Sequence, residues 1–475
     1  MAISTSQDAV AVSAPSSTGY LVPLAFLTIL FFMWGFITAL NDVLIPHLQN
    51  VFSLTNLQAL LVQFAFFIAY FIVSFVYFVY ALKAGDLLVR FGYQNGLSVG
   101  LAVMSVGCAL FWPAAEFMSY GFFLVALFVL AGGMAVLQIA ANPYVSILGE
   151  PKGASARLNL SQALNSLGTT LAPVIGAALI FSHVAADADV NTVVPPYLFM
   201  AATLLAMAVF FKVVKLPNLH TAVAPTENRY GVFQHTHLLL GALSIFMYVG
   251  AEVALGSVLI KYLGLPEIAG LNEVQASVYL ALYWAGLMVG RFLGAAAFSD
   301  WAKRKSVYGY FAVVTGIAFL CVGLLVGWQA AQIWSLLIIV NIALMAVCRF
   351  KPNRTLAGFG VACVVLLLLA FYQKGFWALW CVVAVGLFNS IMWSNIFTLS
   401  IRDLGSYTSQ GSSLLIMAIL GAALIPPLMG WVADAYDLNV SLLVPAACYL
   451  YIVFYGARGY RAQKNNWLDG ARDLS

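Results

Sequence analysis

Long apolar runs separated by short polar segments dominate the sequence. Six runs precede a polar stretch between Lys215 and His237, and they lie at about 20–45, 57–81, 96–112, 121–148, 157–181 and 195–214. Six more lie at about 238–263, 275–298, 355–372, 376–401, 410–432 and 438–459, and this second set encloses two further runs at about 306–327 and 333–348. A helix needs about 20 apolar residues to cross a bilayer, whereas a membrane β-barrel shows strand-type alternation, which these runs lack. The pattern predicts an all-α polytopic membrane protein with about 14 spans.

The composition excludes several classes of protein. Hydrophobic residues make up 63% of the 475 positions and charged residues only 8%, whereas soluble proteins carry about 25% charged residues. This excludes a soluble enzyme, a disordered chain and a nucleic-acid binder. The six cysteines lie in or beside apolar runs, the five histidines lie in loops or at span ends, and hydrolase and metalloprotease motifs are absent. We therefore expect no catalytic residue, metal site, disulfide or cofactor.

Basic residues predict the orientation of the spans. With a cytoplasmic N-terminus, 18 of the 21 Lys and Arg residues fall in inner segments. Only Lys261 and Lys374 fall outside, and Arg291 lies near the inner end of a span. Positive residues concentrate on the cytoplasmic side of membrane proteins. Both termini are therefore predicted to be cytoplasmic, and the extra pair of spans must leave the membrane and return as a hairpin.

Weak internal similarity predicts two related halves. The segment from Asn142 to Gly149 resembles the segment from Asn395 to Gly405, and a Ser-Gln pair opens the next span in each half, at Ser161 and Ser409. Two parallel six-helix bundles are the architecture of alternating-access carriers. The predicted organisation is a cytoplasmic tail (1–19), an N-terminal bundle (20–216), a cytoplasmic loop (217–237), a C-terminal bundle (238–460) with an extra hairpin at about 306–348, and a second cytoplasmic tail (461–475).

Two carboxyl groups cannot be assigned to loops, tails or span ends. Asp42 follows Leu40-Asn41 in the first span, and Glu252 lies in the middle of its run. An ionised carboxylate within a membrane span costs about 3 kcal/mol or more, so such groups usually face water or a partner. We found no Lys or Arg within a span to pair with either group, and this favours a proton-carrying role. Two alternatives stay open: Asp42 ends its helix before Pro46, or Glu252 makes a structural bond between helices.

Neutral polar residues form a second set of candidates. Gln138 and Asn142 share one helix face, as do Gln162 and Asn165, because residues three or four apart lie on the same side. Amides pair with sugar hydroxyls, and aromatic rings stack on the apolar face of a pyranose. The alternative is that the amides join helices. The predicted substrate-binding residues are Gln138, Asn142, Gln162, Asn165, Gln63, Asn389, Asn395, Trp284 and Trp34.

Glycine and basic residues recur in two inner loops that occupy equivalent positions in the halves. Glycines four residues apart at Gly286, Gly290 and Gly294 are typical of close helix packing. Positive side chains in such loops can bond the carbonyl groups at helix ends and lock one conformation. The predicted gating residues are Gly85, Arg90, Arg291 and Asp300.

Seven stretches together resemble the fucose–galactose–glucose symporter family of the major facilitator superfamily: Leu40–Asp42, Leu110–Glu116, Ala140–Pro143, Arg157–Gly168, Tyr248–Glu252, Val289–Gly294 and Gly386–Met392. The resemblance covers nearly the whole chain except 306–348. It implies a twelve-helix sugar:cation symporter fold, with Asp42 as a protonation site and Gln162 and Asn165 as sugar contacts. Gln138 stands where the L-fucose–proton symporter has Glu. The glucose/galactose branch that the chain resembles has Gln at this position and Glu at the position of Glu252.

We therefore expect a hexose importer of the bacterial cytoplasmic membrane that works by alternating access. The expected coupling ion is a proton, with sodium as the alternative, and Asp42 and Glu252 are the coupling residues. Glucose and galactose are the first candidate substrates, and L-fucose, mannose and N-acetylglucosamine are alternatives because Trp393-Ser394-Asn395 replaces a more usual Phe-Pro-Thr. An exporter would favour apolar walls, and a sensor would carry a long cytosolic segment. The expected partners are a hexose and membrane lipid, with no nucleic acid, and the expected state is a monomer.

Overall fold

The computed structural model describes residues 20–54, 56–181, 190–214, 216–217, 230–300 and 305–461. At several helical positions, among them Asp42 and Gln63, only the backbone is described. The predicted tails, apart from Arg461, and most of the predicted loop at 217–237 lie outside these residues.

The first half of the chain forms a bundle of long helices, which we call the N-terminal bundle. Ser119 caps one of them by accepting a hydrogen bond from the backbone N–H of Phe122. The helices are α1 (Leu21–Val51), α2 (Asn56–Ala84), α3 (Leu87–Phe91), α4 (Tyr93–Ala109), α5 (Phe111–Glu116), α6 (Tyr120–Ile147), α7 (Ala154–Phe181) and α8 (Val194–Val213).

The second half forms the C-terminal bundle. A capping box at Asn272 and Gln275 begins one helix, and a proline in the first turn begins another at Pro352. The helices are α9 (Thr236–Gly264), α10 (Glu273–Ala297), α11 (Ser306–Leu325), α12 (Trp328–Val347), α13 (Pro352–Tyr372), α14 (Phe376–Asn389), α15 (Met392–Ser400), α16 (Thr408–Met417), α17 (Gly421–Ala435), α18 (Leu438–Ser441) and α19 (Leu443–Phe454).

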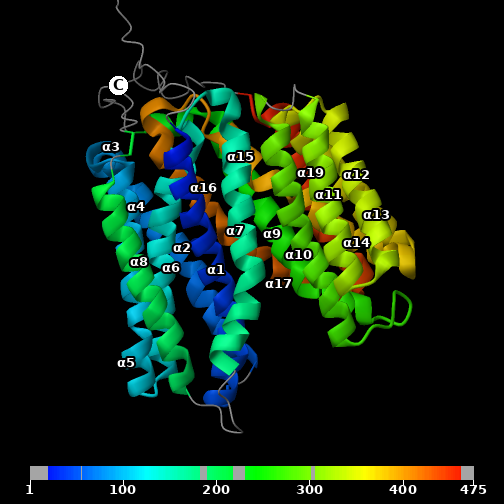
Figure 1. Cartoon of the computed structure of the whole chain (residues 1–475), viewed down its shortest axis with the longest axis horizontal. Coiled ribbons are helices and arrows are strands. Elements are labelled where there is room, and N and C mark those ends of the chain that lie inside the picture. Colours follow the sequence, from blue (N-terminus) through cyan, green and yellow to red (C-terminus); the bar gives the residue numbers. More distant parts are fainter. Residues whose placement is uncertain are drawn as a thin grey trace, which may run out of the picture.

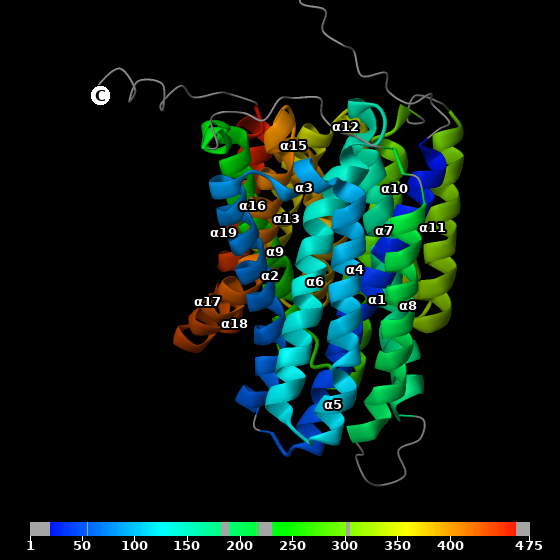
Figure 2. The ribbon, with the colours of Figure 1, turned by 90° about the vertical axis from the view of Figure 1, so that its left-hand side faces the viewer.

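The two bundles stand side by side with their helices roughly parallel to one common direction (Figure 1). Thirteen helical segments of the described chain are long and apolar enough to cross a membrane. The 28-residue helix α7 also runs beside α1 through the height of the N-terminal bundle (Figures 1 and 2). The predicted all-helical membrane fold is therefore confirmed.

Helix packing identifies which spans are additional to a two-fold six-helix plan. Helix α4 packs against α6 and α8, and α13 packs in the same way against α14 and α19. Likewise, α2 packs on α6 as α10 packs on α14. These correspondences leave α11 and α12 without counterparts in the N-terminal bundle. They form the extra hairpin at the predicted place, because they pack on each other and on α10 and α14.

The hairpin presents one face to the bundle and a broad apolar face outward. Trp334 and Asn341 are fully buried, and the Asn341 side chain donates to the carbonyl of Leu387 over 3.3 Å. In contrast, Leu324 and Leu325 are about 80% exposed, at 77% and 82%. Exposed apolar side chains at membrane depth are covered by lipid.

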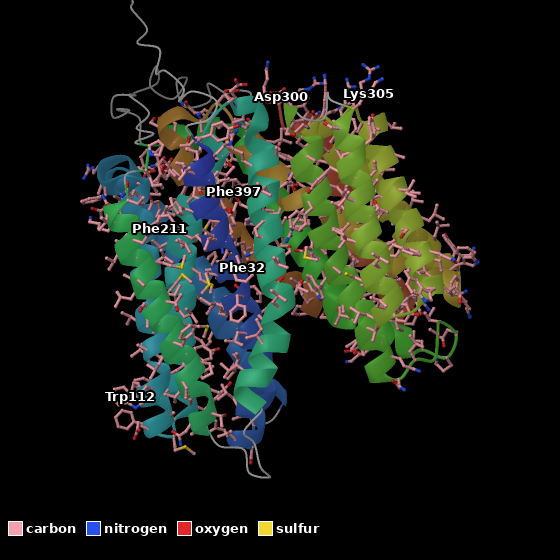
Figure 3. The ribbon with its side chains drawn as sticks, in the orientation of Figure 1. Phe32, Trp112, Phe211, Asp300, Lys305 and Phe397 are labelled. Atoms are coloured by element: carbon pink, nitrogen blue, oxygen red, sulfur yellow. The ribbon has the colours of Figure 1, made fainter. Side chains whose placement is uncertain are left out.

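Basic side chains gather at one end of the molecule, which we call the basic end. Figure 3 shows Lys305 at this end, together with Asp300, and Trp112 at the opposite end. Helices of both bundles begin or end there. The exposed basic residues at or beside these helix ends are Lys83, Lys152, Lys212, Lys351 and Arg402.

Candidate functional site

A chain of polar side chains crosses three helices of the N-terminal bundle. Gln138 on α6 donates to the hydroxyl of Tyr70 on α2 over 2.8 Å, and a second side-chain hydrogen bond links Tyr70 to Trp34 on α1. The Tyr70 hydroxyl in turn donates to the sulfur of Met134 over 3.4 Å. All four side chains are buried. The chain therefore holds the Gln138 amide and the Trp34 ring in fixed positions.

Several amide atoms near this chain are buried without a partner among the described side chains. They are the side-chain oxygens of Gln138 and Asn142 on α6 and the side-chain nitrogen of Gln162 on α7. The other ends of two predicted amides are occupied: Asn142 donates to the carbonyl of Gln138 over 3.1 Å, and Asn165 donates to the carbonyl of Phe31 over 3.0 Å. Buried polar atoms are normally paired, so these atoms can accept from and donate to a bound water or ligand.

The C-terminal bundle contains a buried carboxyl group within its own hydrogen-bond network. Glu252 on α9 accepts from the Tyr248 hydroxyl over 2.8 Å, and its backbone carbonyl accepts from Tyr283 on α10 over 3.1 Å. The side chain of Asn389 on α14 donates to the Tyr283 hydroxyl over 3.1 Å and accepts from Cys363. Asn389 therefore joins helices of this bundle, the alternative that sequence analysis had left open for such amides.

Arg291 on α10 corrects one expectation from the sequence. Its guanidinium is buried, and its charge acts on Glu252 electrostatically, so a basic group within the spans is available to this carboxylate. Arg291 also donates to the backbone carbonyl of Ser390 over 3.1 Å and to the hydroxyl of Ser166 on α7. Sequence analysis placed Arg291 near a span end and did not pair it, because pairing depends on how α9 and α10 pack.

Hydrogen bonds join the two bundles towards the basic end. Ser155 on α7 bonds Thr398 on α15 over 2.8 Å, and Tyr93 on α4 bonds Ser409 on α16 over 3.3 Å. The Asn395 side chain accepts from Asn159 on α7 over 3.4 Å. These contacts hold the bundles together at that end.

The remaining predicted residues lie in different surroundings. Asn395 also donates to the carbonyl of Pro352, so its described contacts are at the bundle contact near the basic end. Trp284 is 41% exposed, and its ring meets the Tyr283 ring edge-on at 5.2 Å between centroids. The Asp42 and Gln63 side chains lie outside the described part, so their predicted roles stay predictions.

Three of the predicted gating residues, Gly85, Arg90 and Asp300, lie at the basic end, whereas Arg291 lies buried within α10. Gly85 adopts a left-handed backbone with φ +92°, and a Cβ there would lie 3.2 Å from a guanidinium nitrogen of Arg90. Asp86, beside it, accepts from the Tyr77 hydroxyl over 2.8 Å. Asp300 lies at the corresponding end of α10 (Figure 3). The loop geometry at Gly85 thus depends on a residue without a side chain.

Sequence reasoning missed the residues that partner the candidates. Tyr248 lies four residues before Glu252, a spacing that places both on one helix face and could have indicated the bond. Ser166 lies four residues after Gln162, so the same spacing places these two residues on one face of α7. The pairing of Asn159 with Asn395 gives no sequence signal, because it joins separate bundles.

Comparison with known proteins places the chain in a family. Residues 24–350 match the model of the Major Facilitator Superfamily. A glucose/galactose transporter of Brucella abortus is 43% identical and covers 94% of this chain and 96% of its own length. The L-fucose-proton symporter of Escherichia coli is 32% identical over 96% of this chain and 97% of its own length. A crystal structure of that superfamily, the transporter FucP in the outward conformation, is 30% identical over 93% of this chain and 99% of its own, with a TM-score of 0.74. The chain therefore belongs to the Major Facilitator Superfamily.

Proposed function

We propose that the protein is a secondary active importer that couples uptake of a hexose to entry of a cation. The observation that carries the proposal is the set of buried amide atoms on α6 and α7 that have no partner among the described side chains: those of Gln138, Asn142 and Gln162. A polyol offers donors and acceptors to such atoms, and Trp34 lies on the same polar chain as a candidate stacking surface. The names of the similar transporters favour glucose and galactose as first substrates, with L-fucose next.

A proton is the proposed coupling ion, and Asp42 and Glu252 are the proposed carriers. The similar L-fucose-proton symporter and the solved fucose:proton symporter support this choice, whereas none of the named relatives supports sodium. Glu252 is buried beside two tyrosine hydroxyls and within reach of the Arg291 charge. A carboxyl group in such a place can gain and lose a proton only when the surrounding helices move to admit water.

The basic end is proposed to face the cytoplasm, because positive residues concentrate on that side. In that orientation, the hydrogen bonds near the basic end close the cytoplasmic side, as expected of an outward-facing state. The bacterial relatives favour the inner membrane of a bacterium. Lipid around the exposed apolar faces and a monomeric state complete the proposal.

Uptake by purified protein in proteoliposomes tests this function. An imposed proton gradient, acidic on the side that the protein takes sugar from, should drive accumulation of labelled glucose or galactose. A sodium gradient of the same size is the control, and mannose, L-fucose and N-acetylglucosamine define selectivity. Accumulation of none of these sugars under either gradient would contradict the proposal.

Asp42→Asn sharpens the same assay. The amide keeps the shape but cannot release a proton, so uphill uptake should fall more than about tenfold while sugar exchange at equal concentrations persists. Accumulation equal to that of the unchanged protein would remove Asp42 from the coupling role.

A further inference from the structure

A buried cation at the meeting point of the two bundles needs an explanation beyond packing. Arg291 is 8% exposed in a chain whose charged residues make up only 8% of all positions. Charged side chains within membrane spans are costly, and they persist where they pair or act. The partners of Arg291 come from three other elements: α9 through the charge of Glu252, the segment between α14 and α15, and α7 of the other bundle.

The α14–α15 junction provides the first partner. The span breaks at Ser390 and Ile391, between the end of α14 at Asn389 and the start of α15 at Met392. Neither proline nor glycine occupies the break, so sequence alone does not account for it. Arg291 donates to the carbonyl of Ser390 within this break. The guanidinium therefore satisfies a carbonyl that the interrupted helix exposes.

The second partner lies in the N-terminal bundle. The Ser166 hydroxyl donates its proton to the carbonyl of Gln162 over 3.0 Å, which leaves its lone pairs free to accept from Arg291. Ser166 thus connects Arg291 to the backbone of a predicted sugar-binding residue. The bond from Arg291 to Ser166 exists only while α7 and α10 lie against each other.

A second route connects Glu252 to the same break. The Glu252 carbonyl, the Tyr283 hydroxyl and the Asn389 side chain form a hydrogen-bonded series that ends one residue before Ser390. The charge interaction and the hydrogen bonds therefore meet at neighbouring residues, Asn389 and Ser390. This series fixes the backbone of Glu252 relative to the end of α14, whereas the Glu252 carboxylate acts on the break through the charge of Arg291.

We propose that Arg291 is a positioning residue that links the charge on Glu252 to closure of the basic end. Its guanidinium is the counter-charge of the Glu252 carboxylate and, in the same state, the donor that holds α7 against the α14–α15 break. The inference deepens the proposed symport and rests on it for its transport meaning. Its geometry makes predictions that need no sugar and no transport.

Distance measurement between spin labels on the full chain in lipid nanodiscs tests the closure. One label pair replaces the exposed residues Lys152 and Arg402 at the basic end, and a second replaces Phe117 and Gln373 at the opposite end, after native cysteines that react are changed to serine. Arg291→Gln should raise the ratio of open to closed basic ends by more than about tenfold, the effect of losing one hydrogen bond from a charged group. The opposite end should close in parallel.

Ser166→Ala and Arg458→Gln complete the distance experiment. Ser166→Ala removes the acceptor on α7 together with its bond to the Gln162 carbonyl, keeps the charge pair, and should open the basic end to a similar degree. Arg458→Gln removes an exposed arginine and should leave both distances unchanged. Unchanged distances in both Arg291→Gln and Ser166→Ala would overturn the closure part of the proposal.

Thermal unfolding of a double-mutant cycle tests the charge link. Arg291→Gln leaves the Glu252 carboxylate without its counter-charge, so Glu252→Gln in the same chain should recover part of the lost Tm. Strict additivity of the two Tm changes would overturn the charge link. If Arg291→Gln does not fold, recovery of folding in the Arg291→Gln/Glu252→Gln double variant replaces the Tm comparison, because the double variant leaves no buried charge without a partner. A double variant that also fails to fold would overturn the charge link. A coupled cycle with no sugar uptake by the unchanged protein would refute only the proposed transport.

Discussion

The polar groups of the two bundles differ in which of their atoms have hydrogen-bond partners. In the N-terminal bundle, the chain from Trp34 through Tyr70 to Gln138 is neutral, and the amides of Gln138, Asn142 and Gln162 keep atoms that no described group bonds. In the C-terminal bundle, Glu252 is charged when ionised, and tyrosine hydroxyls bond both its side chain and its backbone carbonyl. The first arrangement suits a ligand that brings its own hydroxyls, and the second suits a proton that comes and goes. In the proposed function, the amides of the N-terminal bundle recognise the sugar, and Glu252 adds a coupling group in the C-terminal bundle to Asp42 on α1.

The largest effect should come from Glu252→Gln. The amide cannot cycle between charged and neutral forms, so uphill sugar accumulation should fall more than about tenfold, while exchange at equal concentrations persists. Gradient-driven uptake in proteoliposomes measures the accumulation, and counterflow measures the exchange at equal concentrations. Tyr248→Phe, which removes one bond and keeps the carboxyl, is the matched control and should cost less. If Glu252→Gln abolished sugar binding instead, Glu252 would act in sugar recognition and not in coupling.

Gln138→Ala tests the other half of the comparison. Removing the amide should weaken sugar binding about tenfold, close to the upper value for one neutral hydrogen bond in a buried site. Isothermal titration with the transported sugar measures the change. Gln94→Ala is the control, because Gln94 bonds backbone carbonyls at Phe211 and Val214 and should affect stability rather than affinity. Equal losses of affinity in both variants would show that Gln138 acts through packing.

Gly290→Ala should disturb the scaffold of the C-terminal group. A Cβ at this position would collide with the Ser390 hydroxyl, so α10 must separate from the α14–α15 break. Overpacking of this kind costs about 1–3 kcal/mol of unfolding free energy. Gly316→Ala on α11, where nothing lies within 4 Å, should stabilise the helix by about 0.5–1 kcal/mol. Thermal unfolding compares the two, and a stable Gly290→Ala protein would contradict the close packing.

The smallest effect is expected for Ser155→Ala. The change removes the bond to Thr398 and should raise the ratio of open to closed basic ends by about threefold. The label pair at Lys152 and Arg402 reports the ratio. Thr203→Ala is the control, since Thr203 bonds only the carbonyl of Phe199 within its own helix. A response no larger than that of the control would show that this contact does not hold the bundles together.

The fold follows from the sequence to a large extent because membrane spans carry a strong signal. Apolar runs gave the spans, and the two additional runs gave the hairpin of α11 and α12. Breaks of the helix within a span were harder to predict from the sequence. Proline usually breaks or kinks a helix, yet α6 continues through Pro143 to Ile147, in agreement with the apolar run at 121–148. The actual break at Ser390 contains no helix-breaking residue. The break is instead contacted by α10, through the bond from Arg291 and the close approach of Gly290.

The residue types of the candidate site could be predicted from the sequence more readily than the pairs that these residues form. The scarcity of carboxyl groups within the spans identified Glu252, and the four-residue spacing of Gln138 and Asn142 placed them on one helix face. The partners come from other helices, as Tyr70 does for Gln138, and no spacing rule predicts them. Arg291 was assigned to a span end because its sequence position is close to one. Only the packing of α10 between α9, α14 and α7 makes it a buried cation.

The hairpin of α11 and α12 makes the halves unequal in size. Two extra helices enlarge the lipid-facing perimeter of the C-terminal bundle alone. Viscous drag from the bilayer grows with that perimeter, and opposing rotations divide in inverse proportion to drag. In the proposed alternating access, the N-terminal bundle is therefore expected to turn through a somewhat larger angle relative to the lipid than the C-terminal bundle.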